Sequence, residues 1–188
     1  MLIKEDVIGK PQYVSANFGF AAPVNMEGRL LNKTLGGGSV MDVGVYPIFL
    51  SALILGAPSL IQSVSNLTVT GVDEYANMIM KYPNGETAHL LSAINFNSGI
   101  EAEIIGTKGS IKVHNPWFKA TDVSVHLPGG ATQNFSIPHL CNGFEYEIKE
   151  VMHCLDNNLL QSNKMPHHLT LLVSKIMDEV LRQAGVVY

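Results

Sequence analysis

Residues 73–96, DEYANMIMKYPNGETAHLLSAINF, decide the fold class of this chain. Apolar and polar residues alternate on both sides of an Asn84-Gly85 pair, the dipeptide that most strongly predicts a tight turn between antiparallel strands. We therefore expect strands at 73–82 and 86–96, joined as a hairpin. Met78, Ile79 and Met80 are consecutive apolar residues, which predicts apolar side chains on both faces of the sheet.

Strand patterns continue on both sides of this hairpin. Strands are predicted at 10–20, 60–70, 100–106, 110–114, 122–127 and 131–136, and most of the turns between neighbours are too short for a parallel crossover. Helical patterns occupy 39–55, 143–157 and 166–184, whereas 21–35 has no clean period and is expected to be a long loop. The layout predicts an α+β fold, with a large open, predominantly antiparallel sheet and helices packed on one face.

The composition excludes several classes of protein. The chain has 188 residues, a formal net charge of −4 and only 15% charged residues. A mildly acidic protein lacks the basic stripe that nucleic acid requires, and the longest apolar run, 48–55, is too short to span a bilayer. Two cysteines and no visible secretory signal predict a reducing, cytoplasmic compartment. The low charge indicates a surface that is partly covered or binds something.

The first helix follows a run of three glycines, Gly36 to Gly38. Ser39 is predicted to cap this helix, with the Asp42 carboxylate reaching back to the cap amide. Pro47 falls inside the helix and predicts a kink or break. The glycines do not follow a strand of a βαβ unit and precede no Lys-Ser/Thr pair, so they are not a phosphate loop. Their favoured role is to let backbone segments approach closely.

Asp42 and Tyr46 are the candidate catalytic pair. They are four residues apart, so on an α-helix their side chains lie on one face. A phenol beside a helix start, with a carboxylate one turn away, can act as a general acid or base. The alternative is that Asp42 only completes a cap and Tyr46 is an ordinary half-buried aromatic residue. The sequence spacing alone favours that alternative.

No metal site is predicted. His167 and His168 are adjacent, so their side chains diverge on a helix, and no carboxylate or thiolate lies at ligand spacing around them. His153 and Cys154 are also consecutive and are expected to be structural. An enzyme working alone through a metal or a covalent intermediate is therefore the least favoured hypothesis.

Several stretches together resemble the glucose–fructose oxidoreductase/inositol dehydrogenase (Gfo/Idh/MocA) family. The resemblance is greatest to the branch that contains dimeric dihydrodiol dehydrogenase and NADP-dependent xylose dehydrogenases, in which Tyr rather than His ends the glycine-rich motif. The matching stretches cover almost the whole chain: VSANFGF near the start, GGGSVMDVGVYP at 36–47, GVDE at 71–74, YPNGETA at 82–88, IIGTKGSIKVHNPW at 104–117, GFEYEIKEV at 143–151 and AGVVY at 184–188.

The resemblance implies a mechanism and a site. Tyr46 would accept or donate the proton of a sugar, polyol or diol hydroxyl, and Asp42 would position the site. Phe18, Trp117 and Phe118 would line the substrate pocket, although packing within the sheet is an equally supported role for these rings. Arg29 would contact substrate or cofactor, with a solvated loop arginine as the alternative. The NAD or NADP of such enzymes is held by an N-terminal Rossmann domain.

The resemblance also implies that residues 1–188 correspond to the C-terminal substrate-binding and dimerisation domain. The Rossmann motif Gly-x-Gly-x-x-Gly and the Glu-Lys-Pro segment of the family are absent from this sequence. We therefore expect this chain alone to bind no cofactor and to be inactive, and expect a homodimer through the sheet face. A non-enzymatic binding or assembly module that retained the scaffold is the rival hypothesis.

Overall fold

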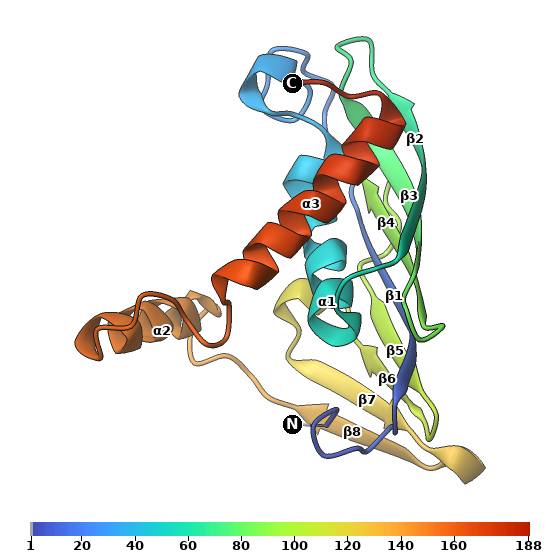
Figure 1. The fold of residues 1–188 in the computed structure, drawn as a ribbon, viewed down its shortest axis with the longest axis vertical. Coiled ribbons are helices and arrows are strands. Elements are labelled where there is room, and N and C mark those ends of the chain that lie inside the picture. Colours follow the sequence, from blue (N-terminus) through green and yellow to red (C-terminus); the bar gives the residue numbers. More distant parts are fainter. Residues whose placement is uncertain (1) are drawn as a thin grey trace.

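The computed structural model describes residues 2–188 and contains one eight-stranded sheet (Figure 1). The strand order is β2-β3-β4-β1-β5-β6-β7-β8, and among the described strands only the β1–β4 pair is parallel. The predicted open, predominantly antiparallel sheet is therefore confirmed. The strand bounds are β1 Pro11–Gly19, β2 Leu60–Leu67, β3 Asp73–Lys81, β4 Thr87–Ala93, β5 Ala102–Gly106, β6 Ser110–Val113, β7 Asp122–His126 and β8 Thr132–Ser136.

The β3–β4 hairpin forms where the sequence predicts it. Lys81 pairs with Thr87, and the turn closes through hydrogen bonds from the Tyr82 amide to the Glu86 carbonyl (2.9 Å) and from the Gly85 amide to the Tyr82 carbonyl (3.0 Å). Gly85 has φ +95°, which is why glycine is needed there. Met78 and Met80 are fully buried, whereas 57% of Ile79 is exposed on the opposite face. The sheet thus has an inner, buried face and an outer face that also carries apolar side chains.

Two helices cover the inner face of the sheet (Figure 1). They are α1, Val45–Leu55, and α3, His167–Ala184. Their buried residues pack with the inward side chains of the strands into one core. This core includes Ile48, Ala52, Leu169, Val173, Ile176, Val180, Val14, Met78, Met80, Leu90 and Ile104.

The first helix is not a continuous α-helix from residue 39. Val40–Gly44 form a π-helical segment, and the α-helix begins only at Val45. Pro47 explains the change, because a proline has no amide hydrogen and its ring collides with the carbonyl four residues earlier. The wider π turn gives that carbonyl room. The expected break is therefore displaced upstream of Pro47, which itself lies buried in the first turn of α1.

The segment Lys33–Leu55 has the length and apolar composition of a membrane-spanning helix. It is divided into a 3-10 turn at Lys33–Leu35, the π-helical segment and α1. Half of its apolar stretch is buried inside the protein, with Val40, Ile48 and Ala52 in the core. Packing against the sheet therefore accounts for the buried half of this apolar stretch.

The third helix, α2, runs from Phe144 to Asp156 and projects away from the sheet (Figure 1). None of its residues, all of which the structure describes, is buried. At its start the Glu145 carboxylate accepts hydrogen bonds from the amides of Cys141, Asn142 and Gly143. Burial acts to raise the pKa of Glu145, but hydrogen bonds from these three amides and from its own amide outweigh that effect and hold the pKa at about 2.

Candidate active site

Two aromatic rings from distant parts of the chain pack against the ring of Tyr46. The Tyr46 ring centre lies 5.3 Å from that of Phe18 on β1 and 5.6 Å from that of Phe118 in the 3-10 turn Trp117–Lys119. Phe18 and Phe118 are stacked, with centres 4.6 Å apart. Tyr46 remains 41% exposed. The structure thus brings three of the sequence-predicted site residues together, with the phenol at an accessible position.

Asp42 and Arg29 form an ion pair beside this cluster. The Asp42 carboxylate is largely covered, whereas the Arg29 side chain is mostly exposed. The carboxylate raises the pKa of Arg29 above its ordinary value, through the hydrogen bond first and through charge attraction second. Arg29 is therefore paired with Asp42 while most of its side chain stays in contact with solvent.

The predicted cap at the start of the first helix is wrong. A capping residue must have extended backbone dihedrals. Ser39 has helical dihedrals instead, and its side chain therefore makes no capping hydrogen bond. Asp42 is paired with Arg29 instead of the cap amide. The free amide at the start of this helix is instead bound by Asp73, at the start of β3. The Asp73 Oδ2 accepts hydrogen bonds from the Val40 amide (2.8 Å) and from the Ser39 hydroxyl (2.6 Å). Ser39 Oγ also lies 2.9 Å from Ser92 Oγ.

The glycine run lets several backbone segments approach closely, as the sequence predicts. A Cβ atom on Gly37 would lie 2.8 Å from the Leu30 carbonyl oxygen and 2.9 Å from those of Arg29 and Asn32. Gly38 has φ +118°, and a Cβ there would collide with Asp73. Close packing of these glycines therefore connects the Arg29 loop to the start of the helix that carries Asp42.

Asp73 and Tyr188 are site-supporting residues that residue-by-residue reasoning did not single out. Burial raises the pKa of Asp73, and the hydrogen bonds from Ser39 and Val40 act in the opposite direction. Tyr188 donates its hydroxyl hydrogen to the Gly37 carbonyl. Burial and the nearby Asp73 charge raise the pKa of Tyr188 to about 12. The only sequence signal for either residue is its place in GVDE or AGVVY.

Trp117 lies in the core rather than in the aromatic cluster. It is only 9% exposed, and its Nε1 donates a hydrogen bond to the Asn17 carbonyl at 2.7 Å. This placement fits the packing alternative for Trp117 and fixes the turn that presents Phe118. Lys119, which the sequence reasoning missed, places its Nζ 5.8 Å from the centre of the Phe118 ring.

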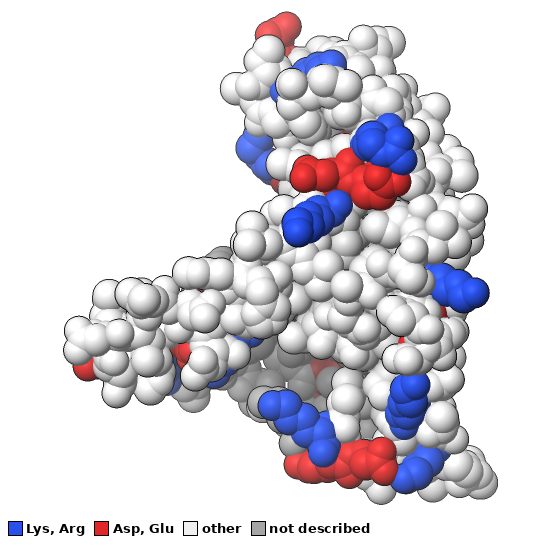
Figure 2. Space-filling model, viewed as in Figure 1, with Lys and Arg blue, Asp and Glu red and all other residues white. Residues whose placement is uncertain are grey.

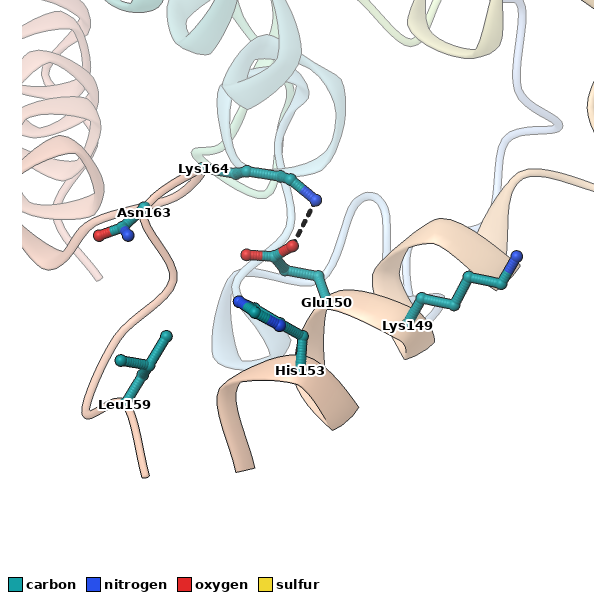
Figure 3. Close-up of a pocket in the computed structure, with 6 residues that line it drawn as sticks. All are labelled: Lys149, Glu150, His153, Leu159, Asn163 and Lys164. Atoms are coloured by element: carbon teal, nitrogen blue, oxygen red, sulfur yellow. Dashed lines mark hydrogen bonds and ion pairs between the residues drawn. The ribbon is translucent and has the colours of Figure 1, made fainter. Parts of the chain in front are cut away.

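An apolar groove of about 320 Å³ opens beside Tyr46. Val45, Tyr46 and Phe49 of α1 line one side, and Val173 of α3 and Met165 line the other. A second cavity, of about 330 Å³, lies on the polar side of α2 (Figure 3), and the aromatic cluster contributes none of its lining residues. Within residues 2–188, no three His, Cys, Asp or Glu side chains are grouped to hold a metal ion.

Comparison with known proteins gives a consistent result. The family model described as the GFO/IDH/MocA C-terminal domain matches residues 1–112. Trans-1,2-dihydrobenzene-1,2-diol dehydrogenase from Xenopus tropicalis is 31% identical over the whole chain, which covers 58% of that relative. The scyllo-inositol 2-dehydrogenase (NADP(+)) IolU from Bacillus subtilis is 31% identical over 82% of this chain and 46% of its own length.

Solved structures match the fold over nearly the full chain. An aldose-aldose oxidoreductase from Caulobacter crescentus, complexed with glycerol, superposes with a TM-score of 0.81 at 21% identity, covering 98% of this chain and 56% of that one. A 3-ketoreductase from Actinomadura kijaniata, in complex with NADP and TDP-benzene, gives a TM-score of 0.79 at 20% identity, over 97% of this chain and 56% of that one. The chain thus spans little more than half the length of the proteins that it matches.

Proposed function

Because the chain belongs to the GFO/IDH/MocA family through its C-terminal domain, we propose that it supplies the substrate-binding and proton-transferring half of an NAD(P)-dependent oxidoreductase. The substrate class is a sugar, polyol or diol, and the reacting group is a CH–OH carbon. The names of the relatives, a diol dehydrogenase and an inositol dehydrogenase, support this class.

The observation that carries the proposal is the exposed Tyr46 phenol against the stacked Phe18 and Phe118 rings. The apolar face of a sugar or diol ring packs well on such aromatic surfaces, and this places a hydroxyl group within reach of the phenol. Tyr46 then takes the hydroxyl proton in oxidation and returns it in reduction. The Arg29–Asp42 ion pair fixes the helix start from which Tyr46 projects.

The diphosphate of a dinucleotide does not fit at the glycine run of this chain. The glycine run, which would be its nearest cradle, is enclosed by the carbonyl oxygens of Leu30, Arg29 and Asn32 and by the Asp73 carboxyl group. Oxygen atoms directed at a phosphate repel it, whereas phosphate loops present amide hydrogens. When bound, NAD(P) supplies the hydride chemistry, and we assign its binding to polypeptide outside residues 1–188.

Titration of the 188-residue chain with NADPH tests this assignment. We expect no saturable change in NADPH fluorescence at concentrations up to millimolar, because the glycine run cannot accept the diphosphate. The same titration of a full-length relative, such as the Xenopus tropicalis enzyme, is the positive control. Tight binding of NADPH by the 188-residue chain would refute the assignment of cofactor binding to polypeptide outside residues 1–188.

Turnover is tested in a joined protein. It consists of the region of the Xenopus tropicalis dehydrogenase that lies outside its match to this chain, followed by residues 1–188. We expect NADP-dependent oxidation of a trans-dihydrodiol or a related polyol by this joined protein. The absence of any turnover, with NADPH still bound, would favour a non-enzymatic role for this domain.

We further propose that the outer face of the sheet forms a homodimer. Exposed apolar side chains lie on it at Leu60, Val64, Ile79 and Ile105. We expect light scattering at tens of micromolar to give a dimer, and Ile79→Glu to give a monomer because a charge would then be buried in the interface. Ser174→Glu on the exposed side of α3 is the control. A monomeric wild-type chain would contradict this prediction.

A further inference from the structure

Helix α2 carries an apolar stripe that nothing in the described chain covers. The stripe consists of Phe144, Ile148, Val151, Met152 and Leu155, whose exposed fractions lie between 56% and 72%. Their spacing places them on one side of the helix. Leu140 before the helix and Leu160 after it are also highly exposed. In Figure 2 the arm that α2 forms is largely uncharged on the visible face.

The chain's own loop covers the other side of α2. Glu150 accepts a hydrogen bond from Lys164 (Figure 3) and another from Ser162, and both of these residues lie in the segment that joins α2 to α3. Each residue advances about 100° around a helix, so Glu150 lies nearly opposite the centre of the stripe. The orientation of α2 is therefore fixed through its polar side, and the apolar side is left facing outward.

A helix of this kind is not stable without a partner. Isolated helices of about a dozen residues are marginal in water, and packing of the apolar face supplies most of their stability. α2 has 13 residues and contributes none to the core. The exposed stripe is too extensive to be a chance distribution of single apolar residues on a surface.

The relatives indicate what the partner is. The Xenopus tropicalis dehydrogenase aligns with the whole chain, α2 included, and the match lies in its C-terminal part. Roughly two-fifths of that relative lies outside the match, a length typical of a whole domain. α2 therefore belongs to the part that the two proteins share, and in the relative it coexists with an additional domain.

The position of α2 relative to Tyr46 agrees with this partner. Met165, in the segment between α2 and α3, lines the apolar groove beside Tyr46. α2 projects on the side of the sheet that carries α1 and α3, and the first described residues lie on the same open side (Figure 1). A domain that presents a nicotinamide to Tyr46 must lie on the side of the sheet where α1 carries Tyr46, and α2 projects on that same side.

We propose that the apolar stripe of α2 is the docking surface for the nucleotide-binding domain of the enzyme. This inference rests on the function proposed above. The stripe holds the two halves together on the side of the sheet where Tyr46 is exposed, and so sets the distance between the phenol and the reacting end of the cofactor. A second copy of the chain is a poorer occupant, since one short helix offers less area than a stable dimer interface needs.

Hydroxyl-radical footprinting with mass spectrometry tests the docking surface, with oxidation of Met152 as the readout. In the joined protein we expect Met152 to react about tenfold more slowly than in the 188-residue chain, because docking excludes solvent from the stripe. Ile148→Glu combined with Leu155→Glu should restore the fast rate. Lys149→Glu, which changes the net charge by the same amount on another side of α2, should leave Met152 protected. The substituted residues are exposed and outside the core, so circular dichroism should show the overall fold intact in every variant.

The outcomes separate this inference from the proposed function. Turnover by a joined protein in which Met152 reacts as fast as in the chain alone would overturn the docking surface and leave the function standing. Protection of Met152 without turnover would support the docking surface and contradict the proposed function. A third outcome would also overturn the proposal. If Met152 were oxidised slowly in the 188-residue chain alone, and the stripe variant both restored fast oxidation and abolished a dimer, the stripe would contact a second copy.

Discussion

Replacing Tyr46 with phenylalanine in the joined protein will lower kcat by about 10²–10⁴-fold, the usual contribution of a positioned general acid or base. The substitution removes only the hydroxyl group. The ring keeps its contacts with Phe18 and Phe118, so the substrate should still bind on the aromatic surface and KM should change little. Steady-state rates with a trans-dihydrodiol and NADP at several pH values measure both parameters.

Tyr75→Phe is the matched control for this prediction. Tyr75 lies on β3, and its ring packs against Phe96 rather than against the aromatic cluster. Removing its hydroxyl should leave kcat within twofold or so of the parent value, as is common for changes away from a site. If both variants retained full kcat, the Tyr46 phenol would not be the proton carrier, and Tyr46 would be a packing residue.

Features with a local sequence signal could be predicted, whereas features that depend on contacts between distant residues could not. The β3–β4 hairpin was predictable because Asn84-Gly85 is a local signal that acts over a few residues. The insertion of β1 between β4 and β5 was not, since it depends on the order in which distant strands pair. The same division applies to the site. Tyr46 was identified through its spacing from Asp42, and Phe18 and Phe118 through the family resemblance, whereas the contact between the three rings depends on how the sheet folds.

The helix start shows why local rules fail where distant groups compete. Ser39 has the side chain of a capping residue and precedes a helix, so the local pattern predicts a cap. Asp73, from a strand 33 positions beyond Val40, supplies a carboxylate acceptor to the same amide, and charge-assisted hydrogen bonds are the stronger ones. In α2, likewise, the sequence specifies an amphipathic helix but cannot specify what packs against its apolar side.

Gly37→Ala is expected to destabilise the 188-residue chain by ~3 kcal/mol, at the upper end of the cost of overpacking a well-packed site. The new Cβ would lie within 2.9 Å of three backbone carbonyl oxygens, those of Leu30, Arg29 and Asn32. Backbone atoms cannot rotate away as a flexible side chain can. The Arg29 loop or the start of the helix must therefore shift. Urea unfolding followed by circular dichroism measures the loss.

Gly36→Ala separates crowding from backbone preference. Gly36 has φ +69° and open space where a Cβ would stand, so alanine there should cost only ~1 kcal/mol, the penalty of a left-handed conformation. In the joined protein, Gly37→Ala should also lower kcat, because the carbonyls that it displaces belong to the loop that brings Arg29 to Asp42. Equal destabilisation by the two variants would mean that the close approach at Gly37 does not hold the site together, and that the Asp73 and Tyr188 hydrogen bonds to this segment suffice without it.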